Sequence, residues 1–235
     1  MKAAESPDKH PLDNPVWHAL TGPQKGFALQ AGPMRWYPPD VAPFCAFEER
    51  NEAALELALA DPQLASRSVV LFRPQLEPAP LGWTLTHHSS AVQMICPDDS
   101  RLISPDIQTA TLTSADVPDI LALVKLTKPG PFRSRTTELG EYFGVREAGQ
   151  LVALSGERLR LGGFTEVSAV STHPDWRGRG FAGALVSQVA RKAFSEGQTP
   201  FLHVMEGNAG AIRLYQSLGF VERARIHLSV WAALN

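Results

Sequence analysis

A glycine- and arginine-rich turn carries the clearest chemical signal in this sequence. Residues 177–180 read RGRG, and they separate a predicted strand at residues 164–172 from a predicted helix at residues 181–194. Glycine lets a backbone turn tightly and approach a ligand closely, because it has no Cβ. The first turn of the following helix leaves amide N–H groups unpaired at the positive end of the helix dipole. The pattern therefore predicts a site for a phosphate or a pyrophosphate.

This turn differs from the two common nucleotide-binding loops. It lacks the lysine of the GxxxxGK[ST] motif. It also reads RGRGFA, where the dinucleotide motif has GxGxxG and an acidic residue about 20 positions later. Taken alone, the turn is equally compatible with an ordinary helix start that binds no ligand.

The elements around the turn predict a mixed α/β fold. A capping box at residues 113–116 opens a helix that should end before the prolines at positions 129 and 131. The remaining signals alternate between strand and helix patterns, in the order β-α-β-β-β-α-β-α-β for the second half of the chain. The predicted strands are 109–112, 142–146, 151–154, 164–172, 201–205 and 221–231, and the later helices are 181–194 and 208–218.

The first half of the chain predicts a smaller α/β region. Residues 1–43 are expected to be mostly loop, because eight prolines lie between positions 7 and 43 and each removes a backbone donor. Strands are predicted at 44–50, 68–73 and 83–96, with a helix at 52–60. We therefore expect an accessory region over residues 1–107 and a second domain over residues 108–235.

Composition excludes several classes of protein. With 44% hydrophobic and 20% charged residues among 235, the chain can bury a core and is not disordered. No apolar run reaches the roughly 18 residues that span a membrane, and the polar N-terminus is no secretory signal, so a cytoplasmic protein without membrane contact is expected. A net charge of -2 argues against nucleic-acid binding. Two cysteines cannot form a zinc site by themselves, and no metal is expected.

Two motifs together indicate a family. The first is Val170-Ser171-Thr172-His173-Pro174 followed by Arg177-Gly178-Arg179-Gly180-Phe181-Ala182, and the second is Asn208, Ala211 and Tyr215 followed by Leu218-Gly219-Phe220. With them the chain resembles the GNAT superfamily of acyl-CoA-dependent N-acyltransferases, over roughly residues 108–235. The resemblance is closest to members whose C-terminal halves look like glycine N-acyltransferases and whose N-terminal α/β halves are less similar.

The resemblance implies that acetyl-CoA is the co-substrate. It implies that the backbone of Val170, Ser171 and Thr172 pairs with the pantetheine arm as an added strand would. It also implies that a run of backbone amides holds the pyrophosphate and that Asn208 belongs to the cofactor site. The residues of that run are Arg177, Gly178, Arg179, Gly180, Phe181, Ala182 and Gly183.

Catalytic roles follow from the same resemblance. Tyr215 is expected to protonate the leaving thiolate, because a phenol with a pKa of about 10 can donate to a thiol of pKa about 8.5. Glu166, where many members carry an acid that acts through water, is expected to accept the proton of the amine. His203 is a second candidate for the base, and water is a third. Each residue also has a non-catalytic alternative. Tyr215 could pack on the sheet with its hydroxyl satisfied, Glu166 could be a strand-end acid facing solvent, and His203 could be a structural histidine.

The predicted reaction is direct transfer of the acetyl group to a primary amine of a small molecule or a peptide. The acceptor would bind near Pro131, Phe132 and Arg133, and a homodimer remains open. A CoA-binding regulatory module without turnover is the main alternative. A nucleotide-binding or RNA-associated protein is less favoured, because the chain lacks a basic aromatic platform.

Overall fold

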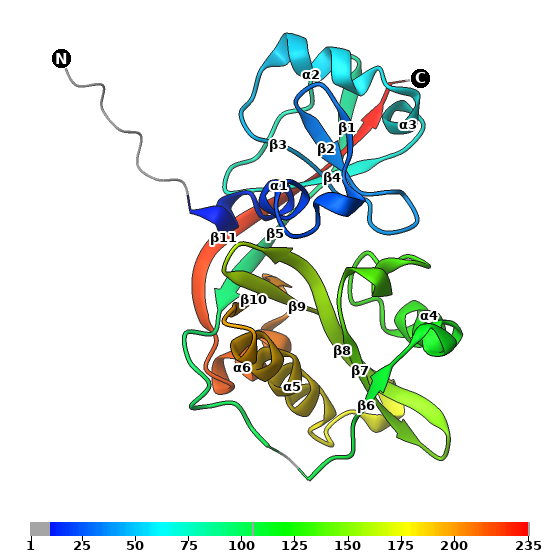
Figure 1. Ribbon diagram of the computed structural model, residues 1–235, viewed down its shortest axis with the longest axis vertical. Helices are drawn as coiled ribbons and strands as arrows, with labels where there is room; N and C mark the ends of the chain where they lie inside the picture. Colours follow the sequence, from blue (N-terminus) through cyan, green and yellow to red (C-terminus); the bar gives the residue numbers. More distant parts are fainter. Residues whose placement is uncertain (1–9, 105, 235) are drawn as a thin grey trace, which may run out of the picture.

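A single eight-stranded sheet runs through the computed structural model, which describes residues 10–104 and 106–234 (Figure 1). The order of its strands is β4-β11-β5-β10-β9-β8-β7-β6. The strands are β4 (Val69–Arg73), β5 (Trp83–Ile95), β6 (Ala110–Leu112), β7 (Tyr142–Glu147), β8 (Gln150–Leu161), β9 (Phe164–Thr172), β10 (Thr199–Met205) and β11 (Val221–Ala233). The mixed α/β architecture predicted from the sequence is confirmed.

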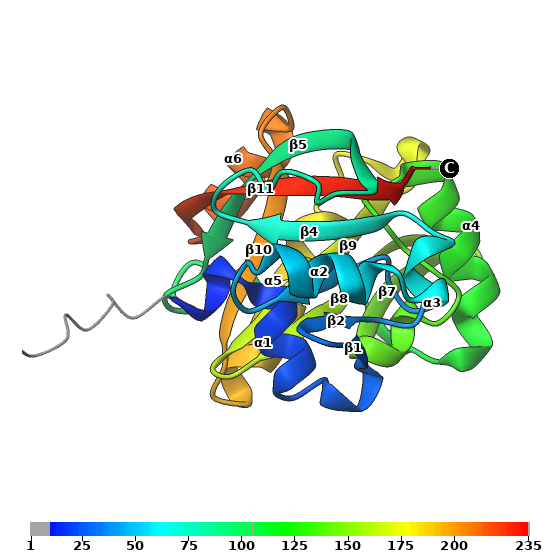
Figure 2. The same cartoon turned by 90° about the horizontal axis from the view of Figure 1, so that it is seen from above.

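Helices cover both faces of this sheet, and a small second sheet lies beside it (Figures 1 and 2). The helices are α1 (Pro15–Thr21), α2 (Glu52–Leu59), α3 (Pro62–Ala65), α4 (Val117–Thr127), α5 (Phe181–Ser195) and α6 (Ala209–Ser217). The small sheet is β1 (Leu29–Ala31), β2 (Met34–Trp36) and β3 (Cys45–Phe47). Short 3-10 helices are η1 (Pro11–Asp13), η2 (Lys25–Phe27), η3 (Ser114–Asp116), η4 (Thr136–Leu139) and η5 (Pro174–Trp176). Within the described residues no helix has the length and hydropathy needed to cross a membrane.

The two faces of the sheet carry different cores. Helices α5 and α6 pack on one face, against buried residues that include Val152, Val167 and Leu202. On the opposite face, α4 packs against Leu154 and Ala169. The N-terminal residues cover the rest of that face through a separate core that contains α1 residues together with side chains of β8 and β10. The opposite face is therefore shared between α4 and the N-terminal region.

The N-terminal region contributes strands to the interior of the sheet. Strand β5 lies between β10 and β11 and pairs antiparallel with both, with His203 opposite Gln93 on the β10 side. Strand β4 extends the same sheet beyond β11. The predicted boundary near residue 107 remains a prediction, and the two parts share one hydrogen-bonded sheet.

The segment that was expected to be mostly loop contains more regular structure. Among the described residues of this segment, η1, α1, η2, β1 and β2 all form. Pro15 does not prevent α1, since it occupies the first turn, where a missing N–H leaves no hydrogen bond unmade. The prolines therefore limit the lengths of these elements without abolishing them.

Local sequence signals in the second half determine element ends as predicted. Thr113 and Asp116 form the capping box at the start of η3, which continues into α4. Ala148 and Gly149 have φ angles of 49° and 84°, so the β7–β8 hairpin turns through two left-handed residues. The observed strands and helices lie within a few residues of their predicted bounds, except that β8 continues to Leu161.

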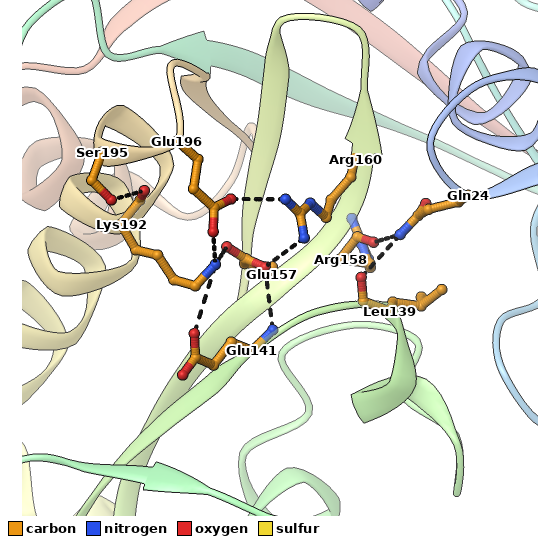
Figure 3. A network of polar contacts seen from close by, with 9 residues as sticks. All are labelled: Gln24, Leu139, Glu141, Glu157, Arg158, Arg160, Lys192, Ser195 and Glu196. Atoms are coloured by element: carbon orange, nitrogen blue, oxygen red, sulfur yellow. Dashed lines mark hydrogen bonds and ion pairs between the residues drawn. The ribbon is translucent and has the colours of Figure 1, made fainter.

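Buried charges tie β8 to its neighbours on both faces (Figure 3). The carboxylate of Glu157 is fully buried and lies 3.0 Å from Nζ of Lys192 on α5. Arg158, the next residue, contacts the opposite face, where Gln24 donates a hydrogen bond of 2.7 Å to its carbonyl. Glu157 thus links β8 to α5 through its side chain, and Arg158 links β8 to the N-terminal region through its backbone carbonyl.

Candidate active site

The start of α5 has the geometry of an anion-binding turn. Gly178 and Gly180 have φ angles of 77° and 80°, a left-handed conformation that glycine adopts without strain. A Cβ at Gly178 would meet nothing within 4 Å, so the backbone faces open space there. A cavity of about 410 Å³ opens over this turn. Its lining comprises Thr172, Trp176, Arg177, Gly178, Arg179, Gly180, Phe181, Ala182, Gly183, Gly210 and Leu214.

The backbone amides of this turn are available to a ligand. Among the described residues, none accepts a hydrogen bond from the amides of residues 178–183. The amide of Arg177 differs, because it donates to the carbonyl of Pro174 at 3.3 Å. Thr172 adds a buried hydroxyl to the wall of the same cavity, and no residue that the structure describes forms a hydrogen bond with it. Of the predicted run of amides, six are therefore free and one is engaged.

Aromatic packing stiffens the entrance to the cavity. The ring of Trp176 stacks on that of Phe181, with centroids 6.4 Å apart and an interplanar angle of 24°. The guanidinium of Arg179 lies 4.3 Å from the centroid of Trp176. Arg179 is exposed, so this cation–π contact leaves its N–H groups accessible to an anion.

Strands β9 and β10 diverge next to this turn. They pair in parallel only from Phe164↔Thr199 to Glu166↔Phe201. Beyond that point, a bulge in β9 places Ala169 and Val170 opposite one residue of β8, and Ala169 has a φ of 54°. The bulge and the divergence leave one edge of β9 without a strand partner over its last residues, within the described part of the chain.

The three residues expected to pair with pantetheine lie along this diverging segment. Ser171 and Thr172 pair with β8 on the other side, opposite Leu154 and Ala153. The hydroxyl of Thr127 on α4 donates to the carbonyl of Leu123 at 2.8 Å, and its oxygen accepts from the hydroxyl of Ser171 at 3.0 Å. These contacts hold β9 in place through β8 and α4, and its edge toward β10 stays open. Their role in binding remains a prediction.

Tyr215 lies on α6, on the face of the sheet that carries α5. It is 7% exposed and packs on Phe220, with ring centroids 6.0 Å apart. No described residue forms a hydrogen bond with its hydroxyl. Burial raises the pKa of Tyr215 to about 12, so the hydroxyl keeps its proton at neutral pH. An unengaged, protonated phenol is suited to donate a proton.

Asn208 has a local structural contact. It is the N-cap residue of α6, and its Oδ1 accepts a hydrogen bond of 3.1 Å from the amide of Ala211. This contact places Asn208 and Tyr215 at the beginning and the end of one short helix. Any contact of Asn208 with a cofactor remains a prediction.

Glu166 lies in a buried ion pair on the opposite face. Its two carboxylate oxygens accept hydrogen bonds of 2.7 and 2.8 Å from the guanidinium of Arg158. One of them also lies 2.7 Å from Nδ1 of His203. Burial alone raises the pKa of Glu166, but Arg158 and His203 outweigh it and lower that pKa to about 2. A carboxylate held in this way is a weak proton acceptor, which counts against its predicted role as the base.

The protonation of His203 follows from its neighbours. Nε2 of Gln93 lies 3.0 Å from Nε2 of His203, and Oε1 of Gln93 accepts from Arg223 at 2.7 Å. Gln93 must therefore present its NH₂ group to the imidazole. The lone pair of His203 Nε2 accepts that hydrogen bond, and Nδ1–H donates to Glu166. Both nitrogens of His203 are thus engaged, so it has no free lone pair for a substrate proton.

Sequence reasoning missed Arg158 as a partner of Glu166. A glycine turn at residues 162–163 joins β8 to β9, and its register pairs Leu161 with Phe164 and Arg160 with Thr165. Continued without a break, this register would place Leu159 opposite Glu166. A second bulge, on β8 between Glu157 and Arg160, leaves both Arg158 and Leu159 facing Glu166, so no simple hairpin pattern in the sequence indicated the pair. Among the described residues there is no group of three or more His, Cys, Asp or Glu side chains that could hold a metal.

Comparison with known proteins identifies the family. The sequence model of the FR47-like protein family matches residues 142–231. A crystal structure from Novosphingobium aromaticivorans, described as an acetyltransferase of the GNAT family, is 36% identical with a TM-score of 0.86. The alignment covers 97% of this chain and 100% of that chain. A GCN5-related N-acetyltransferase from Kribbella flavida is 18% identical with a TM-score of 0.60, over 91% of each chain, which supports the fold alone.

Shorter matches point the same way. An acetyltransferase of Yersinia pestis is 39% identical over 61 residues, or 25% of this chain. The match spans 43% of the length of that relative. Because the Novosphingobium structure aligns at 36% identity over its whole length, the chain belongs to the GNAT family of acetyltransferases.

Proposed function

We propose that this protein transfers the acetyl group of acetyl-CoA to a primary amine by direct attack. The observation that carries the proposal is the cavity over the start of α5, which is lined by two left-handed glycines and by six amides that donate to no described residue. This cavity lies beside the point where β9 and β10 diverge. Membership of the GNAT family supports the same reaction.

The residues of the cavity fit acetyl-CoA. The amides of residues 178–183 and the dipole of α5 suit its pyrophosphate, and Arg179 is exposed beside them. The unpartnered hydroxyl of Thr172 and the open edge of β9 suit the amides of its pantetheine arm. When bound, acetyl-CoA supplies an activated thioester, and the protein needs only to position it beside the amine.

Tyr215 supplies the proton that the reaction requires. As the amine nitrogen bonds to the acetyl carbon and the C–S bond breaks, the Tyr215 hydroxyl donates its proton to the departing sulfur. The phenolate then regains a proton from water, and the amine releases one proton to water. No covalent bond to the protein forms, so the products are the acetylated amine and CoA.

The structure offers a positioning role for Glu166. Its carboxylate holds Arg158 and His203, and both are buried contacts of the sheet. An amine with a pKa of about 10.4 is mostly protonated at neutral pH, so the reaction gains from higher pH whichever group accepts the proton. We propose that water accepts the proton of the amine. The ion-paired carboxylate of Glu166 is also compatible with the alternative function, a CoA-binding module without turnover.

Replacing Glu166 with glutamine separates these roles. The glutamine side chain keeps the size and much of the hydrogen bonding, so kcat/KM for the amine is expected to stay within about threefold of wild type. A general base contributes about 100-fold or more, so a loss of that size would restore Glu166 as the base. Steady-state rates of CoA release, measured on protein shown to be folded by circular dichroism, make this comparison.

Thermal stability with ligands tests the cofactor site. A ligand that binds only the folded state raises Tm by mass action. Acetyl-CoA and CoA are expected to raise Tm, whereas ATP and NAD at equal concentration are not. An absent shift with both CoA compounds would refute the proposed function. A shift without acetylation of any amine in a panel of amino acids, polyamines and peptides would favour the silent module.

Exchanging Gly180 for alanine tests the turn itself. The variant is expected to bind acetyl-CoA at least about tenfold more weakly, because a Cβ would enter the anion site and strain the left-handed backbone. Gly163→Ala is the matched control, since Gly163 has a φ of 81° and a Cβ there would meet nothing within 4 Å, while a Cβ at Gly180 would meet only Cδ1 of Ile107 at 3.9 Å. Both variants should lose similar stability, and only Gly180→Ala should lose affinity in isothermal titration. Equal affinities for the two would contradict the site.

A further inference from the structure

Tyr142 at the start of β7 has a buried hydroxyl without a partner. Its side chain is 2% exposed, and no described residue lies within hydrogen-bond distance of the hydroxyl. A buried hydroxyl that makes no hydrogen bond costs about 1–3 kcal/mol, so such groups call for an explanation. Tyr37, the other buried tyrosine of the same face, does have a hydrogen-bond partner, because its hydroxyl donates to Oε1 of Gln24 at 2.6 Å.

The ring of Tyr142 lies across the neighbouring strand. Tyr142 pairs with Gly156 of β8, and Gly156 pairs with Ser168 of β9, so the three form one row across the sheet. A Cβ added to Gly156 would lie 2.3 Å from Cδ1 of Tyr142, which shows that the ring occupies the space above this glycine. From β7 the side chain therefore extends over β8 in the direction of β9.

This direction leads to β9 just before the segment that is expected to pair with the pantetheine arm. Ser168 immediately precedes the bulge at Ala169, where β9 and β10 have already diverged. Ser168 is half-buried, so the row reaches a partly accessible surface at β9. Tyr215 packs with the core of the other face, which carries α5 and α6. The two tyrosines therefore flank the diverging strands from opposite faces of the sheet.

The surroundings of Tyr142 suit an acceptor. Phe132, in the loop after α4, packs edge-on against its ring with centroids 5.7 Å apart. The nearest charged groups are Arg158 and Glu166, which form a neutral pair, together with Glu157. Burial raises the pKa of Tyr142, which keeps it protonated, while Arg158 and the acids act on it in opposite directions. The hydroxyl is therefore enclosed beside an aromatic side chain of the loop after α4 and within the influence of a paired charge.

We propose that the Tyr142 hydroxyl binds the amine of the acceptor and directs its lone pair toward the acetyl carbon. The oxygen of Tyr142 accepts a hydrogen bond from an N–H of the amine, which supplies the missing partner of the buried group. On the other face of the sheet, the proton of Tyr215 serves the sulfur. This inference rests on the proposed acetyl transfer and assigns the acceptor side of that reaction.

Tyr142→Phe tests the inference, because phenylalanine keeps the ring over Gly156 and against Phe132. The amine of the panel that wild type acetylates fastest is the probe. Its kcat/KM is expected to fall about tenfold, since a hydrogen bond to the reacting nitrogen is lost. The KM for acetyl-CoA and the Tm shift with acetyl-CoA should not change. Without ligand, Tm should be equal to wild type or higher, because an unsatisfied buried hydroxyl has been removed.

Tyr37→Phe is the matched control. It removes a buried hydroxyl that is hydrogen-bonded to Gln24, so it should lower Tm and leave kcat/KM for the amine unchanged. A Tyr142→Phe enzyme that acetylates the amine as fast as wild type would overturn the inference and leave the proposed function standing. A wild-type protein that acetylates no amine of the panel would overturn both. A Tyr142→Phe enzyme that loses only affinity for acetyl-CoA would also overturn the inference, since this result would assign Tyr142 to the acetyl-CoA site.

Discussion

Tyr215→Phe is expected to lower kcat by about 100-fold or more and to leave the affinity for acetyl-CoA unchanged. General acids contribute about 100- to 10,000-fold, and this hydroxyl has no hydrogen-bond partner among the described residues to share that task. The ring itself packs on Phe220, and phenylalanine preserves that contact. Steady-state assays of CoA release at saturating concentrations of both substrates measure kcat. Isothermal titration calorimetry measures the affinity for acetyl-CoA.

The pH dependence of the wild-type enzyme provides a second measurement. Burial raises the pKa of Tyr215 to about 12, above the value of about 10 for a free phenol. The hydroxyl is therefore protonated throughout the range in which amines become neutral, so kcat should not fall between pH 8 and about 10. The pKa of Tyr215 is higher in the folded protein than in the unfolded chain. The stabilisation from the protonated Tyr215 side chain is therefore complete below pH 10 and is lost as pH rises toward 12. A Tyr215→Phe enzyme with wild-type kcat would exclude Tyr215 as the acid.

Arg158→Leu is expected to lower the free energy of unfolding by about 3–5 kcal/mol, the usual effect of leaving one partner of a buried ion pair alone. Glu166 is fully buried, and Arg158 supplies two of its three close contacts. The guanidinium also lies 5.0 Å from the ring centroid of Phe44, so its loss affects the packing of the N-terminal region. Urea unfolding followed by fluorescence measures the change.

The double variant Arg158→Leu/Glu166→Gln is the control for this prediction. Removing the stranded charge should recover a large part of the lost stability, because an uncompensated carboxylate is more costly than a neutral amide. If the single variant Arg158→Leu and the double variant lose the same free energy of unfolding, the unpaired charge of Glu166 is not the cause of the loss.

Acid titration of the wild type tests the same pair. The pKa of Glu166 is about 2 in the folded protein, below the ordinary value of 4.5 that applies to the unfolded chain. Since the folded value is the lower one, the stabilisation is complete above pH 4.5 and is lost as pH falls toward 2. About 3 kcal/mol should disappear over this range. In Arg158→Leu this loss should be absent or reversed, because burial then favours the protonated acid.

Short-range patterns in the sequence were sufficient for most of the elements and for the glycine turn that begins α5. The glycines at 178 and 180 form the tight turn that the sequence predicted, in a left-handed conformation, and Thr113 with Asp116 forms the predicted capping box. Such features depend on a few consecutive residues, because glycine conformation, capping and helix periodicity are local properties. The position of Tyr215 seven residues after Asn208 was fixed in the same way, on one helix.

Only the tertiary structure determined the environment of Glu166. Its partners Arg158 and His203 come from two different strands, and Gln93, which fixes the tautomer of His203, comes from the N-terminal region. The insertion of β5 between β10 and β11 brings Gln93 there, and no local pattern encodes that pairing. The sequence alone thus determined which residue types are present and how each segment folds. The pKa of Glu166 and the unpartnered hydroxyl of Tyr142 were decided by strands far apart in the chain, because burial and charge pairing depend on neighbours in space.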